Sequence, residues 1–263
     1  PDFDLVRSPK SYNSQIGVPL SVWQMQERNT LAIFEAGISQ PGEMEHLEKI
    51  IRPNIGVFTN LGPAHQEGFA SDAEKMAEKM RLFEHAEQLV CEARPIPDHL
   101  KARLFTWSKN GEPANLQIQQ IEKLDKGGVQ IQTTLQTSPP VHRAPSTVHR
   151  EPSPVHRPPS TVTLPFADAA SIENAMNCWC VLLLLGIPQE EITRRMLLLE
   201  PVEMRLEVKA AIQGCTLIND AYSNDLASLK LALQFARQQT GTGKLTLILS
   251  DILQSGMSKT ALW

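Results

Sequence analysis

Short, continuous apolar runs alternate with helical patterns along the first hundred residues. The runs LAIFEAG (31–37), IGVFTN (55–60) and QLVCEA (88–93) have the length and composition of strands that are buried on both faces. Between them, residues 42–51 and 71–86 have the apolar spacing of helices. Strands that alternate with helices in this way predict a parallel sheet. We therefore expect an α/β fold, with a mostly parallel sheet and helices on both of its faces.

The ends of these helices carry recognisable signals. Gly42 lies near the start of the first helix. Ser71 precedes the second helix and is followed three residues later by Glu74, which is the spacing of a capping box. Three further runs, LFTW, LQIQQI and VQIQTTL, are rich in strand-forming residues. We expect them to form a smaller antiparallel patch.

The second half of the chain resumes the α/β pattern. TVTLPF is typical of a strand, and residues 170–186 predict a buried helix that ends at Gly186 and Pro188. A helix at EEITRRMLLLE, strands at RLEVKAAI and CTLIND, a helix at 225–238 and a strand at KLTLILSD follow. We place a boundary near residue 201, which gives one domain over 1–200 and the start of a second, Rossmann-like α/β domain over 201–263.

Residues 138–160 break this pattern with a seven-residue unit that occurs three times, as VHRAPST, VHREPSP and VHRPPST. Each unit carries proline, which is incompatible with a helix interior, so extended or disordered structure is expected. Three histidines, His142, His149 and His156, lie in this segment. A metal-binding tract is one interpretation, but a solvated surface insertion between two strands is favoured.

Composition narrows the class of protein. The chain has 263 residues, a formal charge of −4 and 41% apolar residues, which is a globular composition. The near-neutral charge gives no sign of a nucleic-acid or membrane surface, and no apolar run reaches 18 residues. The N-terminal stretch lacks the apolar region of a signal peptide. The four cysteines form no C-x-x-C pair, so we expect reduced thiols in a cytoplasmic protein.

Candidate metal-binding side chains follow the ends of the predicted strands. Glu35 closes the first buried run and His65 follows the second, and the carboxyl ends of parallel strands are where open sheets bind ligands. A carboxylate and an imidazole together suit a divalent cation that keeps several waters. The alternative for His65 is a loop histidine that only caps or packs. Lys75 and Lys79 share one helix face, and by themselves they are typical of a solvated charged surface.

Several long stretches of the sequence resemble those of a known protein family. RSPKSYNSQIGVPLSVW, FEAGISQPGEMEHLEKIIRPNIGVFTNLGPAHQEGFAS and EKMRLF resemble the central, ATP-binding domain of the Mur ligases, and MRLE with TLINDAYSNDLASLKLAL resembles the start of their C-terminal domain. The resemblance is greatest to the branch that joins D-Ala-D-Ala to UDP-N-acetylmuramoyl-tripeptide. ILSDILQSG resembles the form of that branch fused to an alanine racemase; the pyridoxal phosphate of such a racemase would belong to a region outside this sequence.

The resemblance implies a Mg²⁺ site and a modified lysine. Residues at the positions of Glu35 and His65 help to hold Mg²⁺ in the family, and the lysine that matches Lys79 is commonly carbamylated. Carbamylation is physically reasonable, because it replaces a repelling ammonium with an anionic oxygen donor.

The resemblance also assigns nucleotide and substrate contacts. Asn174 matches an asparagine near the adenine, Arg205 an arginine that reaches the phosphates, and Asp220 an aspartate that binds the ribose. Without the family, Asn174 and Asp220 would be interpreted as helix-cap or turn residues. Ser11 and Asn13 fall where the family binds its UDP-sugar-peptide substrate.

The implied reaction is ATP-dependent amide-bond formation. ATP would phosphorylate the terminal carboxylate of the muramoyl tripeptide, and the amine of D-Ala-D-Ala would displace phosphate from the acyl phosphate. Both reacting groups are anions, so Mg²⁺ and basic groups must offset their repulsion.

The sequence departs from the family pattern in ways that affect this reaction. A phosphate loop, G-x-x-x-x-G-K-S/T, is expected upstream of SPKSYNSQ, where the chain begins too late to include it. GTGK at 241–244 precedes a predicted strand and is followed by leucine. We therefore expect a piece of a larger enzyme that has no ligase activity alone. The alternatives are a folylpolyglutamate-synthase-like ligase and a non-catalytic scaffold whose proline-rich repeat docks a partner.

Overall fold

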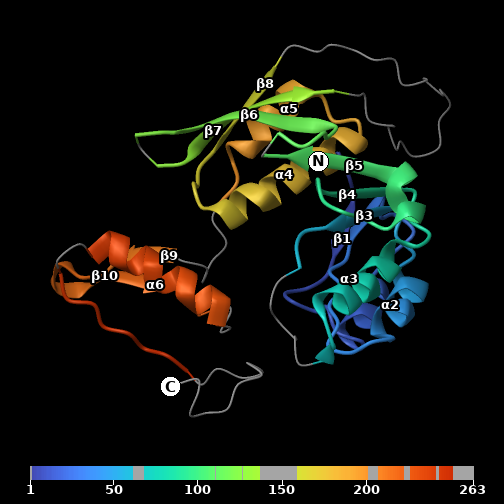
Figure 1. Cartoon of the computed structure of the whole chain (residues 1–263), viewed down its shortest axis with the longest axis horizontal. Helices are drawn as coiled ribbons and strands as arrows, with labels where there is room; N and C mark the ends of the chain where they lie inside the picture. The colour runs from blue at the N-terminus through green and yellow to red at the C-terminus, as the bar shows by residue number, and fades with distance from the viewer. Residues whose placement is uncertain are drawn as a thin grey trace. The chain divides into compact units, whose positions relative to one another are not determined.

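The structure is a computed structural model that describes residues 2–61, 68–109, 111–125, 127–136, 159–200, 207–221, 226–240 and 243–250 (Figure 1). Its contacts divide the chain into two compact units. The first comprises 1–38, 42–60 and 77–200, and the second comprises 39–41, 61–76 and 201–263. Most of the repeat predicted at 138–160 lies outside the described residues.

A six-stranded sheet forms the centre of the first unit. Its strands lie side by side in chain order: β3 (Ile55–Phe58), β4 (Gln88–Glu92), β5 (Leu104–Ser108), β6 (Leu116–Lys123), β7 (Val129–Leu135) and β8 (Ser160–Leu164). The pairs from β3 to β6 are parallel, and β7 and β8 add antiparallel pairs at one edge. The predicted α/β fold with a mostly parallel sheet is confirmed.

The predicted separate antiparallel patch is wrong in part. LFTW lies in β5, which pairs in parallel with β4, and all three of the runs assigned to the patch belong to the same sheet. The chain crosses from the end of β4 to the start of β5 through η3 (Asp98–Arg103). Such a crossover is what a parallel pair requires, and apolar periodicity alone does not reveal which neighbour a strand will take.

A second, two-stranded parallel sheet pairs β1 (Leu5–Arg7) with β2 (Leu31–Ile33), and α1 (Gly17–Val22) lies between them in the chain. The strand predicted over 31–37 is therefore shorter than expected, and it is not fully buried, since Ile33 is 54% exposed. Residues 34–37, which include Glu35, have no regular secondary structure.

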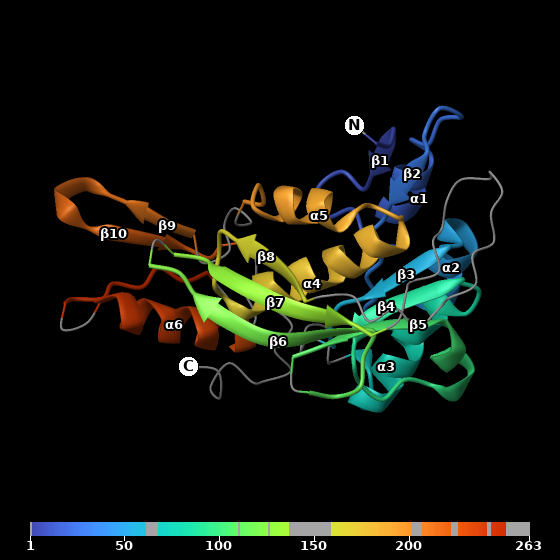
Figure 2. The same ribbon diagram turned by 90° about the horizontal axis from the view of Figure 1, so that it is seen from above.

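The main core lies between the six-stranded sheet and two helices, α4 (Ala169–Leu184) and α5 (Gln189–Met196), on one of its faces (Figure 2). Trp107 of β5 and Trp179 of α4 are both buried there. On the other face, Phe83 of η2 (Arg81–Phe83) packs against β3, where its ring meets that of Phe58 edge to face at 6.5 Å. The sheet is thus covered on both faces.

The predicted helix starts are borne out. α2 (Glu43–Ile51) begins after Gly42, and α3 (Asp72–Met80) begins after Ser71. The hydroxyl of Ser71 accepts a hydrogen bond from the Glu74 N–H at 3.2 Å, and the Glu74 carboxylate accepts one from the Ala70 N–H at 2.6 Å. These two bonds satisfy N–H groups that a helix start otherwise leaves unpaired.

In the second unit, β9 (Glu207–Ala210) and β10 (Thr216–Asn219) form an antiparallel pair joined through η4 (Ile212–Gly214), and α6 (Leu226–Thr240) follows. The strand predicted at KLTLILSD is wrong over 244–250, which has no regular secondary structure. A strand needs a hydrogen-bonded neighbour, and no described strand pairs with this segment. No helix in the described parts of the chain is long and apolar enough to span a bilayer.

Candidate functional site

Two of the predicted site residues meet directly. The Nδ2 of Asn13 donates a hydrogen bond to the Oε1 of Glu35 at 2.8 Å. Asn13 was assigned to the substrate and Glu35 to the metal, and 22 positions separate them in the chain. The contact leaves the carboxylate of Glu35 with further acceptor capacity, because two carboxylate oxygens offer about four lone-pair sites.

The local backbone explains how Asn13 reaches Glu35. The carbonyl of Asn13 accepts a hydrogen bond from the Gly37 N–H at 2.8 Å, and the Ser8 hydroxyl accepts one from the Glu35 N–H at 3.2 Å. A Cβ on Gly37 would lie 3.1 Å from the Cγ of Asn13, which is closer than ordinary packing. Glycine at this position therefore permits the close approach of the two segments.

The predicted metal set is only partly described. Glu35 is exposed, Lys79 is partly buried in the last turn of α3, and His65 lies outside the described residues. Within the described ranges, no three His, Cys, Asp or Glu side chains are grouped so that they could hold a metal ion. The convergence of Glu35, His65 and Lys79 on one cation therefore stays a prediction.

Lys75 differs from the solvated surface residue that its sequence context suggests. Its exposure is only 2%, and burial lowers the pKa of its ammonium. Because a buried charge is costly, a lysine at such a position must gain compensating contacts or lose its proton more readily. Helical spacing identified the shared face of Lys75 and Lys79, but not that this face is shielded from solvent at Lys75.

The three predicted nucleotide residues are divided between the units. Asn174 is exposed on α4 in the first unit, and Asp220 is partly buried directly after β10 in the second. Arg205 lies outside the described residues. Of the two predicted substrate residues, Ser11 is exposed and its carbonyl accepts a hydrogen bond from the Asn13 N–H at 2.8 Å. Their roles in binding stay predictions.

Sequence reasoning missed a line of charged residues at the carboxyl ends of the parallel strands. Lys109, directly after β5, lies 2.7 Å from the Oε1 of Glu173 on α4 and 3.3 Å from the Oε1 of Glu92 at the end of β4. The hydrogen bond to Glu173 raises the pKa of Lys109. Nothing in the sequence pairs residues 64 positions apart, so only the fold could reveal this cluster.

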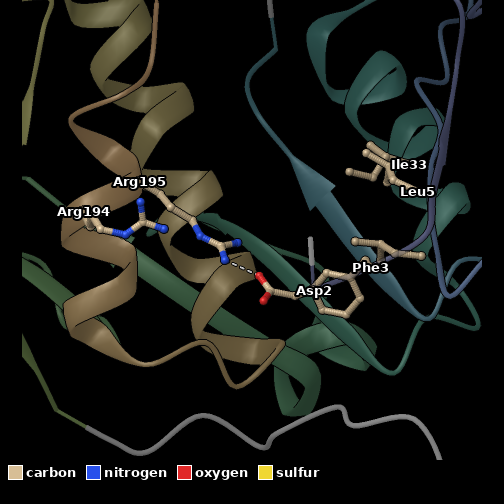
Figure 3. A pocket seen from close by; sticks show the side chains of 7 residues that line it. Asp2, Phe3, Leu5, Ile33, Arg194 and Arg195 are labelled. Atoms are coloured by element: carbon tan, nitrogen blue, oxygen red, sulfur yellow. Dashed lines mark hydrogen bonds and ion pairs between the residues drawn. The ribbon is translucent and has the colours of Figure 1, made fainter.

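A cavity of about 420 Å³ lies elsewhere in the first unit, between the β1 and β2 segments and α5 (Figure 3). Its apolar side includes Phe3, Leu5 and Ile33, and Arg195 forms an ion pair with Asp2 across it. None of the predicted site residues lines this cavity. The predicted site residues and this cavity are therefore separate.

Known proteins resemble the chain along most of its length. It is 24% identical over 250 residues, 94% of the chain, to the UDP-N-acetylmuramoyl-tripeptide--D-alanyl-D-alanine ligase of Bacillus subtilis, of which it covers 50%. The MurF crystal structure from Acinetobacter baumannii superimposes with a TM-score of 0.69 at 20% identity, covering 90% of this chain and 49% of that one. MurF from Thermotoga maritima in complex with ADP gives 0.66 at 19% identity, with 89% and 51% covered.

The share of each protein that is covered determines which conclusions these similarities support. The chain spans about half the length of the curated relatives it matches, and structures this distant in sequence show the shared fold alone. The model of the Mur ligase middle domain matches residues 2–140 of the 263, and the chain belongs to the Mur ligase family.

Proposed function

We propose that this chain is part of an ATP-dependent ligase of peptidoglycan precursor synthesis, which joins D-Ala-D-Ala to UDP-N-acetylmuramoyl-tripeptide. The observation that carries the proposal is similarity along 94% of the chain to a ligase named for that reaction. The hydrogen bond between Asn13 and Glu35 supports it, because a residue assigned to the substrate lies in contact with one assigned to the metal.

The reaction proceeds through an acyl phosphate. The terminal carboxylate of the tripeptide attacks the γ-phosphorus of ATP, and ADP leaves. The amine of D-Ala-D-Ala then attacks the acyl carbon, the bond from that carbon to the phosphate oxygen breaks, and phosphate departs as the amine loses a proton. Neither step needs a covalent bond to the protein, so positioning and charge stabilisation account for most of its contribution.

The residues of this chain have distinct parts in that scheme. Glu35, His65 and a carbamylated Lys79 would hold Mg²⁺, which supplies positive charge between the two anions. Oxygen and imidazole donors suit that ion. Asn13 orients the carboxylate of Glu35 through its side-chain amide. Asn174 contacts the adenine, Asp220 the ribose and Arg205 the phosphates.

The sequence contains no G-x-x-x-x-G-K-S/T loop, and such a loop cradles the phosphates in this kind of site. We therefore expect residues 1–263 alone to release no phosphate from ATP when the tripeptide substrate and D-Ala-D-Ala are both present. The complete product of the gene should release phosphate only with both substrates, and N13A should lower its kcat/KM. A folate and glutamate pair serves as the control substrate.

The outcomes separate the possibilities. Activity of residues 1–263 alone would show that no phosphate loop is needed. Activity of the complete gene product with folate and glutamate in place of the muramoyl tripeptide would replace the proposed substrates. A complete product that is inactive with every pair would favour a non-catalytic scaffold.

A further inference from the structure

Two contacts join β5 and the residue directly after it to α4, and we call them the inner and the outer rung. The inner rung is the hydrogen bond from the Nε1 of Trp107 to the Oδ1 of Asn177, at 2.9 Å. The outer rung is the ion pair between Lys109 and Glu173, at 2.7 Å. Trp107 lies in β5 and Lys109 in the bend directly after it, while residues 173 and 177 are four apart on α4 and share one face of that helix. The helix therefore runs back along the strand, fixed at two points.

The two rungs differ in surroundings. Trp107 and Asn177 are 1% and 3% exposed, whereas the side chains of Lys109 and Glu173 are 35% and 25% exposed. The Nδ2 of Asn177 has no hydrogen-bond partner among the described residues, so the inner rung is a single bond. The outer rung is the charged contact that ties the first turns of α4 to the rim of the sheet, beside the packing of Ile172 and Ala175 in the core.

Further charges hold the outer rung in place. Lys109 also pairs with Glu92, whose other oxygen lies 3.1 Å from Arg94. The guanidinium of Arg94 stacks over the ring of Phe58 at 5.3 Å, at the end of β3. Cations and carboxylates thus alternate across the carboxyl ends of three neighbouring parallel strands and end on α4. Several partners for each charge make such a network more rigid than an isolated surface pair.

Asn174 lies between the rungs, one residue after Glu173 and three before Asn177. Any rotation or lifting of the first turns of α4 would displace its side chain. We infer that Lys109 is a positioning residue for the adenine end of the nucleotide site, acting through Glu173 on the turn of α4 that carries Asn174. This inference rests on the proposed function for its link to ATP, but the rungs themselves belong to the structure.

The first test measures local order in residues 1–263. In K109M, amide hydrogen exchange over 171–178 should accelerate about fivefold, while exchange in α5 and the midpoint of urea unfolding change little. K109R retains the charge and should restore slow exchange. K49M is the matched control, because Lys49 forms an ion pair of 2.6 Å with Glu45 that lies wholly within α2.

The second test measures ATP use by the complete product of the gene. K109M and E173Q should each raise the KM for ATP about fivefold and change kcat less than about twofold, and the double variant should resemble either single one. K109R should keep the KM near that of the unaltered protein. A merely structural role would lower the amount of folded enzyme and hence kcat, without a selective change in KM.

The outcomes are distinguishable. Unchanged exchange over 171–178 in K109M overturns the positioning role. Faster exchange with an unchanged KM for ATP overturns its link to the nucleotide. If the unaltered gene product uses no ATP, the proposed function fails and takes that link with it, while the exchange result still decides whether Lys109 orders α4.

Discussion

The buried carboxylate of Glu78 should be among the most important single side chains for the stability of the first unit. Glu78 is 4% exposed and lies in the last turn of α3. Its Oε1 accepts hydrogen bonds from the N–H groups of Gly42 and Met44, at 2.8 and 3.0 Å, and its Oε2 lies 3.3 Å from Arg81. A side chain of one helix thus accepts from the otherwise unpaired N–H groups at the start of another, α2, which has no side-chain cap of its own.

The magnitude follows from these contacts. Replacing Glu78 with alanine leaves two N–H groups without their acceptor at a largely buried position, and each such loss costs about 1–3 kcal/mol. A negative charge near a helix start adds a further favourable term of about 0.5 kcal/mol. We therefore expect E78A to lower the free energy of unfolding by about 3 kcal/mol. E78Q keeps one acceptor oxygen but loses the charge, so its cost should be about 1 kcal/mol.

Urea denaturation of residues 1–263, followed by tryptophan fluorescence, measures this effect, because Trp107 and Trp179 are both buried in the first unit. E45A is the matched control: Glu45 also pairs with Arg81, at 3.1 Å, but its side chain is 49% exposed. Its loss should cost less than about 0.5 kcal/mol. The reasoning fails if E78A is no more destabilising than E45A.

Three other measurements test the environment of particular residues. Burial raises the pKa of the Cys91 thiol from 9.0 to about 11, so unfolding between pH 9 and pH 11 releases a proton from this thiol. The free energy of unfolding should therefore be full below pH 9 and fall by about 2 kcal/mol by pH 11, less steeply in C91A. A thiol reagent at pH 8 should modify the exposed Cys178 and Cys215 in the folded chain, but buried Cys91 and Cys180 only after unfolding; rapid labelling of all four would contradict the structure. A Cβ on Gly56 would lie 2.2 Å from the buried ring of Phe83, so G56A should cost about 3 kcal/mol in a urea titration. G111A, at a left-handed position with open space around it, should cost only about 1 kcal/mol.

Local patterns in the sequence predicted several of the helices and strands correctly. Apolar spacing, together with the Ser71 and Glu74 signal, correctly predicted α2 and the start of α3, because helix formation depends on contacts within about four residues. The continuous apolar runs at 55–60 and 88–93 correctly predicted two strands of a parallel sheet, β3 and β4, whereas the run at 31–37 contributes β2 to a separate sheet. The long motifs around Glu35 also placed the chain in its family, which composition alone does not reveal.

Pairing between distant segments was decided only by the tertiary structure. The sequence could not show that LFTW joins the parallel sheet, that 244–250 forms no strand in the described structure, or that Lys75 is buried, since each depends on which segment becomes its neighbour. The same holds for the contact between Asn13 and Glu35 and for the pair of Lys109 and Glu173. A hydrogen bond or ion pair acts over a few ångströms in space, whatever the separation along the chain, so the sequence supplied the groups and the tertiary packing brought them together.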